Sequence, residues 1–212
     1  MNQRVITGVI AASILFLFLW LNGWWLAGLL AVLTVIGCIE FFRLAKSASK
    51  AKSHRFICWL LPGFVYICAG IMAFFGIRQL GGVLWLLLII WSTDIAAYEI
   101  GRRFGKTKLA PSVSPNKTWE GSAAGAVAAI IFGGGYATAF MDIHVIAAVL
   151  ASLVLSAAGQ IGDLVESKVK RVAGVKDSGK IFPGHGGMLD RCDSILLASM
   201  LMYLFLVCYK GV

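Results

Sequence analysis

Seven long apolar runs, separated by short polar segments, dominate the chain. A helix needs about 20 predominantly apolar residues to cross the hydrocarbon core of a bilayer, and most of the runs are close to that length. The pattern therefore predicts an all-α fold, a polytopic membrane helix bundle with about seven transmembrane helices. The runs cover Val5–Trp20, Trp24–Leu44, Phe56–Ile77, Gly82–Ile100, Trp119–Met141, Ile143–Gly162 and Met188–Tyr209.

The first run is short and follows Arg4, which leaves a cleaved signal peptide as an alternative. However, Asn22-Gly23 leads directly into the next apolar run, without a clear cleavage site between small residues. We therefore expect the first two runs to form a retained signal-anchor hairpin.

Basic residues are distributed unevenly between the polar segments. If the spans alternate in direction, 17 of the 19 Lys and Arg residues fall on one side, and only Arg78 and Lys210 fall on the other. Positively charged loops stay in the cytoplasm. We therefore expect a cytoplasmic N-terminus and an external C-terminus.

Composition narrows the class of protein further. Apolar residues make up 59% of the chain and charged residues only 14%, whereas soluble domains carry about 25% charged residues. These values exclude a disordered chain and argue against a soluble enzyme.

The formal net charge of +9 would suggest a nucleic-acid partner in a soluble protein. Here it favours an anionic membrane surface or a phosphorylated substrate, because the basic residues lie between apolar runs. The five cysteines form no CxxC pair and predict neither a zinc site nor a disulfide framework.

Acidic residues gather where the predicted spans meet the basic segments. A carboxylate at membrane depth is costly, so each is a functional candidate. Asp163, Glu166 and Lys170 share one face if the chain there is helical, and so do Asp190 and Asp193. Carboxylates so arranged suit Mg²⁺. The alternative is that acids at the start of a helix only stabilise that helix through a favourable interaction with its dipole.

Two polar segments combine glycines with basic residues. Residues 174–187 contain five glycines with Lys176, Lys180 and His185, but no Walker A pattern. Glycines let backbone N–H groups approach phosphate oxygens.

The second polar segment covers residues 101–121. Here Thr118 could cap a helix that begins at Trp119, and the Gly121/Gly125 spacing predicts close helix packing. Either segment alone could be a flexible turn or a basic surface loop, but together they favour a phosphate-handling site.

Residues 167–193 resemble the signature of phosphatidate cytidylyltransferases, the CDP-diacylglycerol synthases. The signature reads S-x-x-K-R, four residues, K-D, and later H-G-G-x-x-D-R-x-D. Residues 94–98, 101–106, 114–121 and 162–167 are similar to the family as well, whereas the first 90 residues match only in hydropathy. Cys192 departs from the family, which usually has an aliphatic residue or Thr there.

The resemblance implies transfer of CMP from CTP to phosphatidic acid, which gives CDP-diacylglycerol and pyrophosphate in phospholipid biosynthesis. It implies N-terminal transmembrane helices over 1–90 and a catalytic transmembrane region over 91–212 with two cytoplasmic phosphate-handling loops. Asp163, Asp190 and Asp193 would hold Mg²⁺, with a second cation such as K⁺ as an option. Lys170, Arg171 and His185 would complete the catalytic set. Substrate would bind to Asp94, Ser114, Asn116, Lys117, Lys176, Lys180, Gly186, Gly187 and Arg191.

The expected partners are CTP, phosphatidic acid and the lipid bilayer, with a homodimer left open and no nucleic acid. We expect a multi-pass protein of the bacterial cytoplasmic membrane, with its active site facing the cytoplasm. One alternative is another CTP-using lipid enzyme, such as a polyprenol or phytol kinase or an archaeal CDP-lipid synthase. A transporter would instead predict acids near mid-span and paired broken helices, and an inactive scaffold would lack motif acids.

Overall fold

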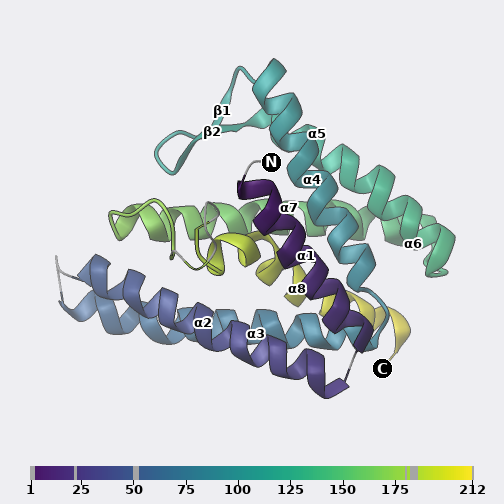
Figure 1. The fold of residues 1–212 in the computed structure, drawn as a ribbon. Helices are drawn as coiled ribbons and strands as arrows, with labels where there is room; N and C mark the ends of the chain where they lie inside the picture. Colours follow the sequence, from purple (N-terminus) through teal and green to yellow (C-terminus); the bar gives the residue numbers. More distant parts are fainter. Residues whose placement is uncertain (1–2, 22, 50–52, 180, 182–185, 212) are drawn as a thin grey trace.

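The computed structural model describes residues 3–21, 23–49, 53–179, 181 and 186–211. Over these residues the chain is helical apart from one short β-hairpin between α4 and α5 (Figure 1). In chain order the elements are α1 (Gln3–Leu21), α2 (Gly23–Ser49), α3 (Ser53–Gln79), α4 (Val83–Phe104), β1 (Lys108–Ala110), β2 (Ser114–Thr118), α5 (Trp119–Ala129), the π-helix η1 (Ile130–Gly134), α6 (Gly135–Phe140), α7 (Val145–Val172) and α8 (Leu189–Lys210).

Six helical segments of the described chain are long and apolar enough to cross a membrane, and α5, η1 and α6 together form one of them. A shorter apolar stretch, Gly8–Leu21, lies in α1. These lengths confirm the predicted all-α polytopic membrane bundle. The orientation of the N-terminus relative to the membrane stays a prediction.

The helix α7 continues ten residues beyond Gly162, where its apolar run ends, and reaches Val172. Its polar end is stabilised by side-chain pairs four residues apart. The Ser167 hydroxyl donates to Asp163 Oδ1 at 3.2 Å, and Lys170 Nζ donates to Glu166 Oε2 at 2.7 Å. The shared helical face predicted for these residues is therefore confirmed.

The fifth span departs from a regular helix at η1, which separates α5 from α6. Before this turn, α5 packs closely on α4. A Cβ at Gly121 would lie 2.6 Å from the Ala97 carbonyl oxygen, and one at Gly125 would lie 2.9 Å from the Thr93 carbonyl oxygen. The close packing predicted from the Gly121/Gly125 spacing is confirmed.

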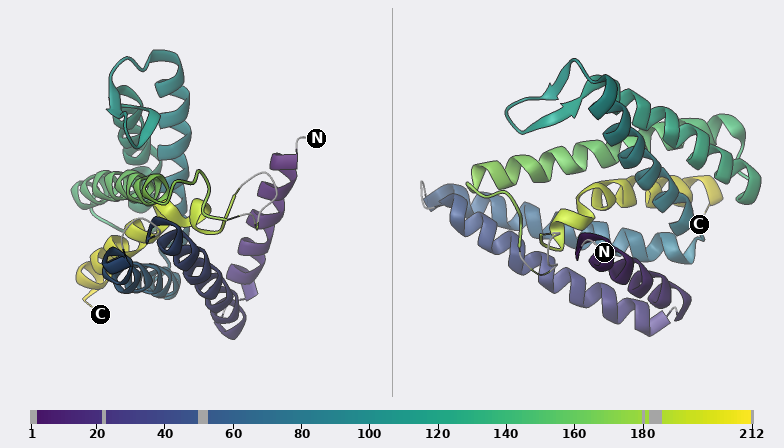
Figure 2. Two further views of the ribbon diagram at one scale, coloured as in Figure 1. Left: turned by 90° about the vertical axis from the view of Figure 1, so that its left-hand side faces the viewer. Right: turned by 45° about the horizontal axis from the view of Figure 1, so that its top comes forward.

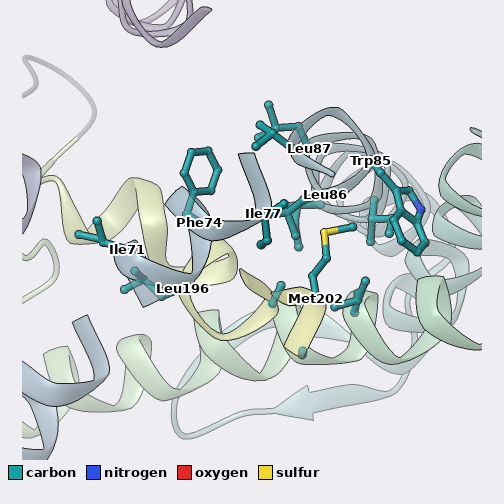
Figure 3. Close-up of a cluster of buried hydrophobic side chains, with 14 of the residues drawn as sticks. Ile71, Phe74, Ile77, Trp85, Leu86, Leu87, Leu196 and Met202 are labelled. Atoms are coloured by element: carbon teal, nitrogen blue, oxygen red, sulfur yellow. The ribbon is translucent and has the colours of Figure 1, made fainter. Parts of the chain in front are cut away.

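Helix α8 packs against both α3 and α7. Figure 3 shows part of this core, where Ile77 of α3, Trp85 and Leu86 of α4, and Met202 of α8 lie together. All four side chains are fully buried. Because lipid tails are as apolar as these side chains, their association depends on close packing rather than on the hydrophobic effect.

The polar segments of the site lie at one end of the bundle. The hairpin and the C-terminal end of α7 are on the same side of the molecule in two views (Figures 1 and 2). At the opposite end, Arg78 donates to the Leu19 carbonyl at 3.1 Å and Lys210 donates to the Leu80 carbonyl at 2.7 Å. Arg78 and Lys210, the two basic residues that the charge pattern assigns to the external side, therefore both lie at this end of the bundle.

Candidate active site

The hairpin contacts α7 through an ion pair at the centre of the candidate site. Lys117 of β2 donates to Asp163 Oδ2, and the Ser167 hydroxyl occupies the other oxygen of that carboxylate. Farther along α7, Arg171 Nε donates to the Val113 carbonyl at 3.2 Å. The hairpin therefore lies against the polar end of α7, which leads directly into the glycine-rich segment at residue 174.

Local hydrogen bonds fix the strand that carries Lys117. Thr118 is the N-cap of α5, and its hydroxyl oxygen accepts from Gly121 N at 3.2 Å, which confirms the predicted cap. Trp119 N donates to the Thr107 carbonyl at 3.0 Å, and Thr107 N donates to Glu120 Oε1 at 3.1 Å. The two strands are a departure from the loop that was expected for this segment.

A second cationic centre lies farther along the same face of α7. Lys170 Nζ contacts Glu166 Oε2 at 2.7 Å and Asp190 Oδ1 at 2.6 Å, so it joins α7 to the first turn of α8. The three side chains are only 7–12% exposed. Glu166 Oε1 is also buried and receives no hydrogen bond from the residues that the structure describes.

Asp190 closes the glycine-rich segment onto α8. Its Oδ2 accepts from Ser178 N at 2.8 Å, from the Ser178 hydroxyl at 2.9 Å and from Gly187 N at 2.8 Å. These donors lie at both ends of the stretch between Ser178 and Gly187. A carboxylate in the first turn also interacts favourably with the dipole of α8. Asp190 therefore holds Ser178 close to Gly187 and also fixes the position of Lys170.

Glu40 of α2 is a site residue that sequence reasoning did not select. Its side chain is 1% exposed and accepts hydrogen bonds from the Ser178 hydroxyl, Met188 N and Leu189 N, each at 3.0 Å. An acid within an apolar span, here near the end of the second span, is a signal for function. Nothing local in the sequence, however, linked α2 to the start of α8.

A mostly apolar cavity of about 310 Å³ adjoins the carboxylates. It lies between α2, α3, α7 and α8, with Phe41, Ile67 and Val165 in its wall. Glu166 and Asp193 line the same cavity. The ionic site is therefore continuous with a space that suits an apolar group.

Two other predicted site residues lie close to this centre. Asp94 of α4 interacts electrostatically with Asp163 and Lys117, and Asp193 interacts with Asp163, Glu166 and Lys170. The other predicted site residues lie on the hairpin, after α7 or at the start of α8. On β2, Ser114 is half-buried and Asn116 is exposed. Lys176 follows α7 and is exposed, Gly186 and Gly187 precede α8, and Arg191 is exposed in the first turn of α8. Lys180 and His185 lie outside the described residues.

The three predicted metal ligands do not converge on one point. Among the residues that the structure describes, no three Asp, Glu, His or Cys side chains are placed to share a metal ion. Asp163 and Asp190 each face a lysine instead. The donors nevertheless suit Mg²⁺, which commonly takes one or two carboxylates together with substrate phosphates. Five carboxylates surround two ammonium groups here: Asp94, Asp163, Glu166, Asp190 and Asp193 around Lys117 and Lys170.

Comparison with known proteins places this site within a characterised sequence family. The model of the cytidylyltransferase family matches residues 60–209, which include the site residues of the hairpin, α4, α7 and α8 but not Glu40 or the part of α2 that lines the cavity. Three similar proteins are each named phosphatidate cytidylyltransferase. The one from Brucella suis is 50% identical over 123 residues, covering 58% of this chain and 46% of its own length. The one from Bacillus subtilis is 47% identical over 133 residues, with coverages of 60% and 48%.

The third relative, from Staphylococcus epidermidis, is 40% identical over 184 residues, which cover 83% of this chain and 70% of the relative. The chain therefore spans about half the length of the Brucella and Bacillus relatives that it matches.

Proposed function

Because this chain belongs to the cytidylyltransferase family, we propose that it is a membrane enzyme that transfers CMP from CTP to phosphatidic acid. The products would be CDP-diacylglycerol and pyrophosphate. The similar proteins are named phosphatidate cytidylyltransferase, which supports this reaction. The observation that carries the proposal is the pair of lysine–carboxylate centres on one face of α7, beside a glycine-rich segment and an apolar cavity.

The chemistry of this reaction fits the residues of the site. A phosphate oxygen of phosphatidic acid attacks the α-phosphorus of CTP, and the bond from that phosphorus to the bridging oxygen of the β-phosphate breaks. The nucleophile is already an anion, so a strong protein base is not needed. Catalysis depends on placing the phosphates in line and stabilising their charge.

Lys117 and Lys170 are the cations best placed to bind these phosphates. In the structure each ammonium group is held by carboxylates. Exchange of a carboxylate for a phosphate oxygen keeps a charge-assisted hydrogen bond, so the lysine does not lose its ionic partner when substrate binds. The two lysines come from different elements, β2 and α7, which suits contacts with phosphate groups at two points of the combined substrates.

Mg²⁺ is the metal ion that this donor set fits, and Asp163 and Asp193 are the ligands that we propose. Asp190 was predicted to be a third ligand, and we keep it in the set although its oxygens already receive four hydrogen bonds. When bound, the ion would neutralise phosphate charge as a Lewis acid. The protein groups would orient the phosphates around it. A second cation such as K⁺ remains part of the proposal.

We also propose that the site faces the cytoplasm from a bacterial cytoplasmic membrane. Support comes from the charge pattern, because 17 of the 19 Lys and Arg residues fall on the side of the site if the spans alternate in direction. The similar proteins are bacterial. In this position the polar site would meet CTP from solution, and the apolar cavity would meet lipid from the adjoining leaflet.

The test is an assay of the purified protein with phosphatidic acid, Mg²⁺ and CTP labelled on either its α- or its γ-phosphate. Label from the α-phosphate should enter the lipid product, and label from the γ-phosphate should leave as pyrophosphate. EDTA should stop the reaction and added Mg²⁺ should restore it. Transfer of the γ-label to lipid would show a kinase, and full activity in EDTA would refute the metal assignment.

A further inference from the structure

We propose that Glu40 is a positioning residue, which holds Ser178 and Gly179 next to Gly187 and the start of α8 in the arrangement that receives the phosphates of CTP. The inference rests on the proposed function and extends it to α2, which lies outside the family-matched residues. Glu40 is almost fully buried. It therefore acts through the segment that it holds rather than by touching substrate.

The Glu40 carboxylate fixes the segment at two places. Its Oε1 accepts from Met188 N, and its Oε2 accepts from Leu189 N and from the Ser178 hydroxyl, all at 3.0 Å. Met188 and Leu189 are the N-cap and the first residue of α8. Free N–H groups at a helix start attract an anion. The carboxylate of Glu40 thus joins Ser178 to the start of α8.

Two glycines of the segment provide the space for this carboxylate. A Cβ at Gly187 would lie 2.5 Å from both Glu40 oxygens, and a Cβ at Gly179 would collide with Glu40 Oε1. A Cβ at Gly187 would also collide with the Ser178 hydroxyl, so any other residue at these two positions would displace the Glu40 carboxylate or the segment that it contacts. The backbone at these glycines is therefore packed against Glu40. This packing explains why glycine is needed at the two positions, in addition to any need to let phosphate approach.

Ser178 transmits the position of Glu40 to the ionic centre. Its hydroxyl lies 3.0 Å from Glu40 Oε2 and 2.9 Å from Asp190 Oδ2, and its backbone N–H donates to the same Asp190 oxygen. Asp190 in turn binds Lys170. A shift of the segment away from Glu40 would therefore move the carboxylate that holds the lysine.

Removal of the Glu40 charge at constant size tests the proposal. Glu40→Gln has to turn an amide N–H₂ group toward one of the N–H donors of α8, so one contact becomes repulsive. Loss of a residue that orients a ligand typically costs about 10- to 100-fold, and we expect the KM for CTP to rise within that range. The KM for phosphatidic acid should change less than about twofold, because the cavity wall is not altered.

Glu99→Gln is the matched control. It makes the same chemical change on α4, where Glu99 binds Arg102 at 3.6 Å and Arg103 at 3.0 Å. This variant should keep the wild-type KM for CTP. Ser178→Ala removes one of the three donors to Glu40 and should give a smaller effect in the same direction as Glu40→Gln.

Hydrogen exchange measured by mass spectrometry gives a readout that does not depend on turnover. In Glu40→Gln the amides of residues 187–189 should exchange faster, while those in the middle of α7 should keep their protection. An unchanged KM for CTP with unchanged exchange at residues 187–189 would overturn the proposal. Equal loss of protection throughout α7 and α8 would also overturn it, because Glu40 would then only support the fold.

If the wild type makes no CDP-lipid, the proposed function fails, but exchange at residues 187–189 with and without CTP still tests the role of Glu40. If Glu40→Gln does not accumulate in the membrane, Glu40→Asp provides the same test. Its carboxylate is one methylene shorter and should reach only part of the donor set. An Asp variant with the wild-type KM for CTP would then refute the proposal.

Discussion

The two polar segments that meet at α7 are held in place in different ways. The hairpin pairs its own strands, Lys108 with Thr118 and Ala110 with Ser114, and the cap at Thr118 secures its return to α5. The glycine-rich segment instead depends on carboxylates of two helices, Glu40 and Asp190, to accept its hydrogen bonds. One segment is stabilised mainly from within, and the other from outside.

This difference determines how each segment should respond to substitution. Loss of a side chain in the hairpin leaves groups that water can reach, because much of it is exposed. Loss of a carboxylate beneath the glycine-rich segment leaves buried N–H groups without an acceptor, and such groups cost about 1–3 kcal/mol each. The comparison therefore predicts larger effects at the glycine-rich segment than at the hairpin.

Asp190→Asn should have the largest effect. The substitution removes the charge that binds Lys170 and replaces an acceptor of three donors by an amide. We expect kcat to fall at least about 100-fold, on the scale of a lost electrostatic group in an active site. The protein should still be found folded in the membrane. Turnover close to the wild-type rate would remove Asp190 from the site.

Lys117→Met should have an intermediate effect, since it removes one phosphate-binding cation but leaves the hairpin backbone paired. The KM for CTP should rise about tenfold, as expected for the loss of one charge-assisted hydrogen bond of roughly 1.5 kcal/mol. The matched change at an exposed lysine of the same hairpin, Lys108→Met, should leave the KM within about twofold. Equal effects of the two substitutions would contradict a specific role for Lys117.

Thr118→Ala should have the smallest effect on turnover. It removes the N-cap of α5, which typically costs about 1 kcal/mol of stability. Hydrogen exchange should speed up at Gly121, whose amide loses its acceptor, while kcat should fall less than about threefold. A loss as large as that of Asp190→Asn would show that the hairpin is as sensitive as the glycine-rich segment, and the comparison would fail.

Local features of the site were predictable from the sequence. The start of α5 at Thr118 and the close approach at Gly121 and Gly125 follow from capping and small-residue spacing. The shared face of Asp163 and Lys170 follows from the period of a helix. These features depend on neighbours within a few residues, so the sequence pattern contains the information that is needed.

Contacts between distant residues were not predictable in the same way. Glu40 lies about 140 residues before Ser178 and 150 before Leu189, and no motif connects them. The sequence also gave no reason to expect that Lys117 and Lys170 are held by Asp163 and Asp190, which the prediction had grouped around a metal ion. Similarly, the sequence analysis did not predict the π-helix at Ile130–Gly134, which packs against α4 and α7.

The space that Gly179 and Gly187 leave for Glu40 has a consequence for how related sequences diverge. A side chain at either glycine collides with the carboxylate, and loss of the carboxylate leaves the amides of α8 without their acceptor. Single changes at these positions should therefore be rare, whereas compensated double changes should be tolerated. Among related sequences, the residue at position 40 should covary with those at 179 and 187, although a long stretch of chain separates them.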